Sequence, residues 1–390
     1  MNIMRTSTYK SIALFSTVAA LLPLASWTAQ WESPLSYTAA QQESSVSAAD
    51  SLDDGPHVYW QTDSRAIVFY LCDEQLVQRV FEDVDTVRFN GFCGDSAVEY
   101  VIPAQAPTIE PQLYDGVPKI FTVSDVHGEY QALVELLENA GVVDAGLHWS
   151  WGEGHLVIDG DIFDRGDKVT ECLWLIYRLE QEARREGGQV HVLLGNHEIM
   201  VMQDDLRYVN EKYTNGIVRR SGIDYDDLFG PDMELGRWLR SKHIVIKLNE
   251  ILFVHAGISP DQVARGLSLE DVNETAQASI DLRSYALAFS DTAEFIFGRT
   301  GPTWYRGYHY GQEGRYPKAS LQTVEAALSY YGATAVVVGH TEIPEVTALY
   351  EGKVFAVDVP LLELGSLQGL LWQGGRFYRV TGAGTLEPLE

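Results

Sequence analysis

The chain has 390 residues, of which 46% are hydrophobic and 21% charged, so it can bury a sizeable core without disulfide support. Its formal net charge of −27 at pH 7 repels the phosphates of nucleic acids and anionic lipid headgroups. We therefore expect neither nucleic acid nor a membrane surface as a partner.

The first 29 residues are predicted to be a signal peptide. Arg5 and Lys10 form a basic start, and the stretch from Ile12 to Ala25 is apolar and uncharged. It is shorter than the roughly 20 apolar residues of a transmembrane helix. We expect a cleaved export signal, with an uncleaved N-terminal anchor as the alternative. The mature chain would then be periplasmic or secreted, with no membrane span.

Residues 30–55 are rich in Ser, Ala, Gln and Asp, lack periodicity, and are predicted to be a linker. A small β-rich module follows over residues 56–117. Its β-like runs are His57–Trp60, Ala66–Leu71, Thr86–Phe89 and Ala97–Ile102. Prolines at 103, 107, 111 and 118 interrupt regular structure and mark the end of the module.

Three cysteines follow the signal. Cys72 and Cys93 lie close together in the β-rich region, where export permits a disulfide between them. Two small buried thiols are the alternative. Cys172 falls on the apolar face of a predicted helix, so we expect a buried free thiol there.

Residues 118–385 are predicted to form a larger α/β domain. Short apolar runs indicate strands buried on both faces, at Lys119–Ser124, His155–Asp159, Val190–Leu194, Ile251–Val254 and Ala335–Val338. Apolar periodicity predicts helices at Glu129–Ala140, Val169–Arg185 and Leu321–Tyr331. Two more polar, mainly helical stretches, 203–242 and 260–297, are expected to form a cap over the sheet edge.

Each of the five predicted strands leads into residues that bind metals. In chain order the candidates are Asp125 and His127, then Asp161, then Asn196 and His197, then His255, then His340. In an open α/β sheet the carboxyl ends of the strands line one edge, where ligands bind. Carboxylate, amide and imidazole without thiolate suit hard to borderline divalent metals. One such segment alone is usually a solvated loop, but five in succession, each after a buried strand, indicate a metal site.

The segments SDVHG, GDIFDRG, GNHE, HAG and GHT resemble the signature of the phosphoprotein phosphatase superfamily of metallophosphoesterases. The longer stretches LLGNHEIM, LRYV, KHIVIKLNEILFVHAGISP and GPTWYRG are similar to its Shewanella-like protein phosphatase branch, which includes cold-active tyrosine phosphatases. The resemblance extends from about Lys119 to Val359. It implies a calcineurin-like β-sandwich of the α/β (α+β) class, flanked by helices and carrying a helical cap. The β-rich module lies outside it.

The resemblance also implies a ligand set for two divalent ions, drawn from Mn, Fe, Zn and Mg. Asp125 and His127 would bind the first ion and Asp161 would bridge both. Asn196, His255 and His340 would complete the second site. Two positions depart from the family pattern. Ser124 stands where many relatives have Gly, and Glu342 stands where nuclease and diesterase relatives have a second His, which favours the protein-phosphatase branch.

A mechanism follows from these assignments. A hydroxide shared by the two metals would be the nucleophile. Because Asn196 already serves as a ligand, His197 is free to protonate the leaving oxygen, and Asp164 would orient the His197 imidazole. Arg165 would grip the phosphoryl oxygens, and Arg306 is a candidate second clamp, with a surface arginine as the alternative.

Aromatic residues near Arg306 offer a further possibility. Tyr305, Tyr308 and Tyr310 either form a wall that stacks on a phosphotyrosine ring or serve ordinary packing.

We therefore expect a metal-dependent phosphomonoester hydrolase, a protein phosphatase that favours phosphotyrosine, acting as a monomer on a phosphorylated protein or peptide. One alternative is a small-molecule phosphomonoesterase or dinucleotide polyphosphatase on the same scaffold. A non-catalytic phosphoprotein- or metal-binding module is the other, although it has no need for a His197–Asp164 pair.

Overall fold

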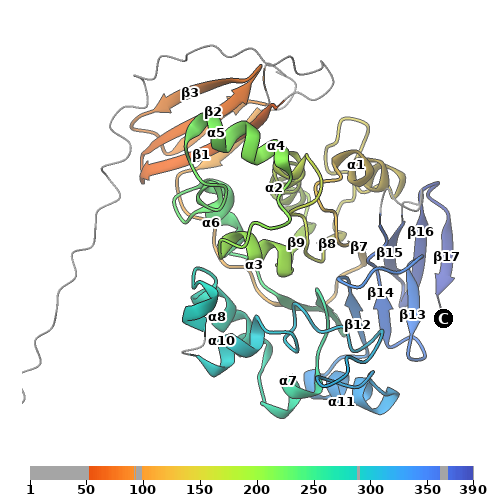
Figure 1. Cartoon of the computed structure of the whole chain (residues 1–390). Coiled ribbons are helices and arrows are strands. Elements are labelled where there is room, and N and C mark those ends of the chain that lie inside the picture. The colour runs from red at the N-terminus through yellow and green to blue at the C-terminus, as the bar shows by residue number, and fades with distance from the viewer. Residues whose placement is uncertain (1–51, 92, 94–98, 288–289, 361–367, 390) are drawn as a thin grey trace, which may run out of the picture. The chain divides into compact units, whose positions relative to one another are not determined.

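The computed structural model, which describes residues 52–91, 93, 99–287, 290–360 and 368–389, contains two six-stranded mixed sheets (Figure 1). The first sheet has the spatial order β13 (Thr347–Leu349), β14 (Val354–Ala356), β12 (Ala335–Val338), β11 (Ile251–Val254), β10 (Val245–Leu248), β6 (Leu113–Tyr114). The second has the order β17 (Leu386–Leu389), β16 (Arg376–Thr381), β15 (Gln368–Gln373), β7 (Lys119–Val123), β8 (His155–Ile158), β9 (Gln189–Val192).

The two sheets face each other across a shared apolar layer. Val157 of β8 and Val337 of β12 belong to one buried cluster, and the rings of Phe355 and Phe377 stack across the sheets with centroids 3.7 Å apart. Side chains alternate along a strand, so neighbours such as Leu156 point to the opposite face and join the core beneath the helices. The fold is therefore a β-sandwich flanked by helices, as predicted, and the continuously apolar strands are buried on both faces.

The helices of the described residues begin and end as follows: α1 (Tyr130–Asn139), α2 (Val169–Arg185), α3 (Asn196–Met202), α4 (Glu211–Tyr213), α5 (Arg219–Ser221), α6 (Glu234–Arg240), α7 (Pro260–Ala264), α8 (Leu269–Ser279), α9 (Ser284–Leu287), α10 (Asp291–Ile296) and α11 (Leu321–Tyr331). A π-helical turn, Thr214–Val218, joins α4 to α5. Helix α2 packs on β9 and α8 on β10. The predicted helices correspond to α1, α2 and α11, and both polar stretches are mainly helical.

The five predicted strands do not share one open sheet. Strands β7, β8 and β9 belong to one sheet, and β11 and β12 to the other. The apolar pattern could not separate these arrangements, because a strand buried on both faces reads the same whether its second face meets a helix or another sheet.

An antiparallel sheet of β1 (Asp54–Thr62), β2 (Arg65–Cys72) and β3 (Gln75–Phe81) forms most of the N-terminal module. A hairpin of β4 (Thr86–Asn90) and β5 (Glu99–Pro103) follows. Strand β3 was not predicted, because polar side chains interrupt its apolar run and most of it is exposed. The predicted signal and nearly all of the predicted linker lie outside the described residues.

A disulfide joins Cys72 to Cys93, and Cys172 is a buried free thiol. Of the two alternatives for the first pair, the bridge is therefore the one adopted.

Hydrogen bonds tie the module to the larger domain. The backbone N–H of Trp60 donates to the carbonyl of Asp232 at 2.9 Å, and the indole of Trp174 donates to the carbonyl of Pro56 at 2.8 Å. Strand β6, from the last part of the predicted module, pairs with β10 of the sandwich. Among the described residues no helix is both long and apolar enough to span a membrane.

Candidate active site

The loops that follow β7, β8, β9, β11 and β12 bring the six predicted metal ligands together. His255 Nε2 lies 3.1 Å from Asp161 Oδ2 and 3.1 Å from Asn196 Oδ1. His127 Nε2 lies 3.9 Å from Asp125 Oδ1, and Asp125 Oδ2 accepts a hydrogen bond from the backbone N–H of His340 at 3.0 Å. All six side chains are buried. Two sheets thus supply one site.

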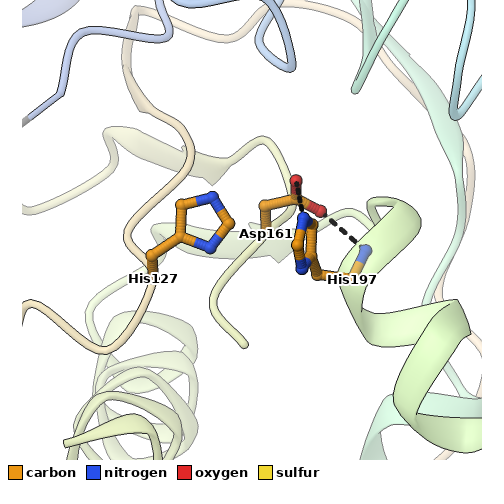
Figure 2. A group of neighbouring side chains, drawn as sticks. All are labelled: His127, Asp161 and His197. Atoms are coloured by element: carbon orange, nitrogen blue, oxygen red, sulfur yellow. Dashed lines mark hydrogen bonds and ion pairs between the residues drawn. The ribbon is translucent and has the colours of Figure 1, made fainter. Parts of the chain in front are cut away.

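Potential ligand atoms gather in two groups that share Asp161. Figure 2 shows the first, in which Asp161 lies between His127 and His197. The second comprises Asp161, His255 and His340, and within each group the ligand atoms lie within 4.8 Å of one another. This shared carboxylate has the position that a bridging ligand needs.

Backbone carbonyls set the orientation of two imidazoles. His127 Nδ1 donates to the carbonyl of Phe163 and His255 Nδ1 donates to that of Asp159, each at 2.7 Å. A carbonyl can only accept, so in the neutral form of each ring the lone pair lies on Nε2. Metal-binding histidines are commonly fixed in this way.

Two buried imidazole nitrogens are placed to bind a metal. His127 Nε2 and His340 Nε2 are both buried without a hydrogen-bond partner among the described residues. A buried polar atom left unpaired costs about 1–3 kcal/mol, whereas a divalent ion in each of the two groups would satisfy these nitrogens. Nitrogen and oxygen donors without thiolate suit Mn, Fe, Zn or Mg. The residues present therefore fit divalent metal binding.

His197 forms a buried pair with Asp164. Its Nδ1 lies 2.6 Å from Asp164 Oδ2, and its backbone N–H donates to Asp161 Oδ1 at 3.0 Å. Burial lowers the pKa of His197, but the charges of Asp161 and Asp164 outweigh it and raise the pKa above its usual value. Because Asp164 occupies Nδ1, Nε2 is the ring nitrogen left to face a ligand.

Of the two predicted arginines, Arg165 lies on a loop that carries a ligand and Arg306 contacts another such loop. Arg165 follows Asp164 and pairs with Glu342 at 3.3 Å, with about half of its side chain exposed to solvent. Arg306 is partly buried and donates to the carbonyl of His340 and to Thr341 Oγ1. Both guanidinium groups therefore lie at the metal-ligand loops.

Of the two alternatives for the tyrosines near Arg306, an aromatic wall or ordinary packing, Tyr305 and Tyr308 follow the second. Tyr305 and Tyr308 are only 1% exposed, and their rings pack on each other with centroids 5.7 Å apart. The Tyr308 hydroxyl donates to the carbonyl of Ile258. These two tyrosines serve packing, because their neighbours leave no face for a substrate. Tyr310 is exposed.

Glu198 contributes a role that the sequence reasoning missed. Its carboxylate accepts hydrogen bonds from the backbone N–H groups of Asp161 at 2.9 Å, Ile162 at 2.6 Å, Phe163 at 3.3 Å and Gly195 at 2.7 Å. Burial, together with the charge of Asp161, raises its pKa to about 7. Glu198 therefore ties the loop after β8 to the start of α3. No helix was predicted here; the signal that could have found it is an acidic residue three positions after Gly195, the spacing of a capping box.

The site concentrates backbone strain. Six of its residues have left-handed φ angles, namely Asp125 (54°), His127 (46°), Asp161 (56°), Asp164 (70°), Arg165 (63°) and His340 (64°). Such conformations cost about 1–3 kcal/mol each and persist only where surrounding contacts impose them. At Gly195 a Cβ atom would overlap Asp161 Oδ1, so glycine is required for the close approach. The loops are held in place by the rest of the fold.

Residues 118–344 match the calcineurin-like phosphoesterase family, and the chain belongs to it. A solved cold-active protein-tyrosine phosphatase of a psychrophilic Shewanella species is 37% identical, with a TM-score of 0.79 over 87% of this chain and 99% of that one. Shewanella-like protein phosphatase 2 of Arabidopsis thaliana is 24% identical, over 71% of this chain and 80% of the relative. Shewanella-like protein phosphatase 1 of Plasmodium berghei is 26% identical, over 59% and 64%. Within its family, this phosphoesterase belongs to the Shewanella-like branch.

Proposed function

We propose that this phosphoesterase is a protein phosphatase that hydrolyses phosphate monoesters and prefers phosphotyrosine. The observation that carries the proposal is the buried His197–Asp164 pair, whose His197 also belongs to the first of the two groups of potential metal ligands. A module that only bound metal or phosphate would not need a proton donor at this place.

Asp125, His127, Asp161, Asn196, His255 and His340 would hold two divalent ions. Bound there, such ions lower the pKa of water and offset the negative charge of the ester. The ligand set leaves the choice among Mn, Fe, Zn and Mg open.

His197 supplies the proton for the leaving oxygen. Its Nδ1 is occupied by Asp164, so Nε2 is the atom that faces the ester. Asp164 keeps the imidazolium protonated and fixes its orientation. A phenolate leaving group, with a pKa near 10, gains more from this proton than an activated nitrophenolate does.

Arg165 and Arg306 position the phosphoryl group. A guanidinium can give two parallel hydrogen bonds to phosphate oxygens, which fixes the group for in-line attack. Arg306 is anchored through the carbonyl of His340, so its position depends on the ligand loop itself.

The phosphotyrosine preference is supported by the 37% identity to a solved tyrosine phosphatase. The competing function is a small-molecule phosphomonoesterase or dinucleotide polyphosphatase on the same fold. One panel separates them: a phosphotyrosine peptide, a phosphoserine peptide, a dinucleotide polyphosphate and a phosphodiester, each after chelation and after metal addition. We expect activity to vanish on chelation and return with metal, highest on phosphotyrosine. Full activity in a sample shown to be metal-free would overturn the metal dependence, and highest activity on the dinucleotide would overturn the substrate.

We also propose that the protein is exported and works as a monomer in the periplasm or outside the cell. The basic start and apolar stretch of residues 1–29 support export, and so does the disulfide between Cys72 and Cys93. Mass spectrometry of the protein from fractionated cells tests this. An intact Met1 on a reduced, cytoplasmic protein would contradict it.

A further inference from the structure

Tyr208 is an exposed aromatic side chain beside the proposed proton donor. Its side chain belongs to the segment between α3 and α4, and 47% of the residue is exposed. Its ring centroid lies 5.4 Å from that of His197, with the planes inclined by 46°. This separation is within the range of about 4.5–7 Å at which aromatic rings interact.

The surrounding chain holds Tyr208 in this place. Its carbonyl accepts a hydrogen bond from the backbone N–H of Arg165 at 3.0 Å, and the side chain of Asn210 donates to the carbonyl of Arg165 at 2.8 Å. The Arg207 guanidinium lies 5.7 Å from the Tyr208 ring and is itself fixed by Asp205 at 2.8 Å. The segment is thus fastened to the loop that carries the proposed phosphate clamp.

This place lies on the leaving-group side of the reaction. Asp164 binds Nδ1 of His197, so Nε2 must deliver the proton, and the ester oxygen must come within about 2.6–3.2 Å of it. In phosphotyrosine that oxygen is bonded directly to an aromatic ring. The substrate ring must therefore lie next to His197, where the partly exposed side chain of Tyr208 is already present.

We propose that Tyr208 is a specificity-determining residue, whose ring stacks on the aromatic ring of phosphotyrosine while His197 protonates its oxygen. In this step water forms a bond to phosphorus and the bond between phosphorus and the aryl oxygen breaks. The electron pair stays on that oxygen, which takes the proton of His197 Nε2, and the attacking water supplies the proton that restores His197. Phosphoserine offers only a methylene at the same point, so it gains little from Tyr208. The inference rests on the proposed function and specifies its substrate.

The test uses the metal-loaded protein with Tyr208→Ala and Tyr208→Phe. Two peptides of equal flanking sequence carry phosphotyrosine or phosphoserine. An aromatic pair contributes about 0.5–1.5 kcal/mol, so Tyr208→Ala should lower kcat/KM on the phosphotyrosine peptide by about 2- to 13-fold. The loss should appear mainly in KM, because stacking acts on bound substrate and transition state alike. The phosphoserine peptide should change by less than about twofold.

Two comparisons guard against a merely structural effect. Tyr208→Phe keeps the ring and should restore the phosphotyrosine activity, whereas Tyr330→Ala, at a tyrosine of α11 that is 42% exposed, should leave both activities unchanged. Equal losses on both peptides, or a Tyr208→Phe variant as poor as Tyr208→Ala, would overturn the role of Tyr208. A wild-type protein inactive on phosphotyrosine would instead remove the proposed substrate, and the role of Tyr208 with it.

Discussion

Replacing His197 with alanine separates proton donation from metal binding. The Nε2 atom of His197 lies 3.9 Å from Asp161 Oδ2 and could reach a metal, while Nδ1 is bound to Asp164 at 2.6 Å. We expect His197→Ala to keep its metal ions and to lose about 10²- to 10⁴-fold in kcat on an aryl phosphate with a poor leaving group. The metal ions should stay bound because Asn196, His255 and the carboxylates remain in place.

A second variant, Asp164→Asn, tests how much the Asp164 carboxylate contributes to proton donation by His197. In Asp164→Asn the imidazole keeps a hydrogen-bond partner but loses a buried charge, since the side chain of Asp164 is 0% exposed. A hydrogen bond to a charged group contributes about 1.5–3 kcal/mol, which corresponds to about 10- to 150-fold in the population of the protonated form. Asp164→Asn should therefore show a smaller loss in kcat than His197→Ala.

The assay is a series of aryl phosphates whose phenols differ in pKa, together with elemental analysis of each variant. The deficit of His197→Ala should grow as the phenol becomes less acidic, and should be small for p-nitrophenyl phosphate. Asp161→Asn serves as the contrast, because it removes the shared carboxylate and should lose metal as well as rate. A constant deficit across the series, or metal lost from His197→Ala, would refute the proton-donor reasoning and make His197 a ligand.

Three further predictions concern stability. Glu198→Gln replaces one of two accepting oxygens with a donor, so two backbone N–H groups lose their acceptor. We expect the free energy of unfolding, measured in urea, to fall by about 2–6 kcal/mol. An unchanged urea midpoint would contradict this. Replacing both Cys72 and Cys93 with serine opens a loop with a sequence separation of 21. The free energy of unfolding of this variant should be about 3 kcal/mol below that of the oxidised wild type, and it should not change on addition of reductant. Burial lowers the pKa of His155 from its usual 6.5 to about 4, so the unfolded chain binds a proton that the folded chain cannot, and stability should fall as the pH drops through this window. His155→Gln should flatten that fall, measured by urea unfolding at several pH values; an identical pH profile would count against the assignment.

Much of the site could be anticipated because its residues follow strands directly. A buried strand ends where its backbone leaves the core, and the next polar side chains, such as Asp125 after β7 or His340 after β12, are confined to the sandwich edge. Local patterns also gave the boundaries of α11, since Ser320 caps its start and Gly332 ends it in the left-handed conformation.

Other features depend on contacts distant in sequence. Nothing near Tyr305 or Tyr308 reveals that their rings are covered, because the covering residues include Tyr350. The exposed place of Tyr208 next to His197 likewise arises from a backbone hydrogen bond to Arg165 across the fold. The assignment of strands to two sheets had no local signal either, as both arrangements bury the same apolar side chains.

Because the candidate ligands come from two sheets, a bound metal would act as part of the scaffold. Asp125 and Asp161 extend from the sheet that contains β7 and β8, whereas His255 and His340 extend from the sheet that contains β11 and β12. An ion held by both sets fastens the sheets together, and it stabilises the native chain by about 2.7 kcal/mol when its free concentration is 100 times its Kd. Under the export proposed above, the metal ions outside the cell would then set how much of this stabilisation the protein receives.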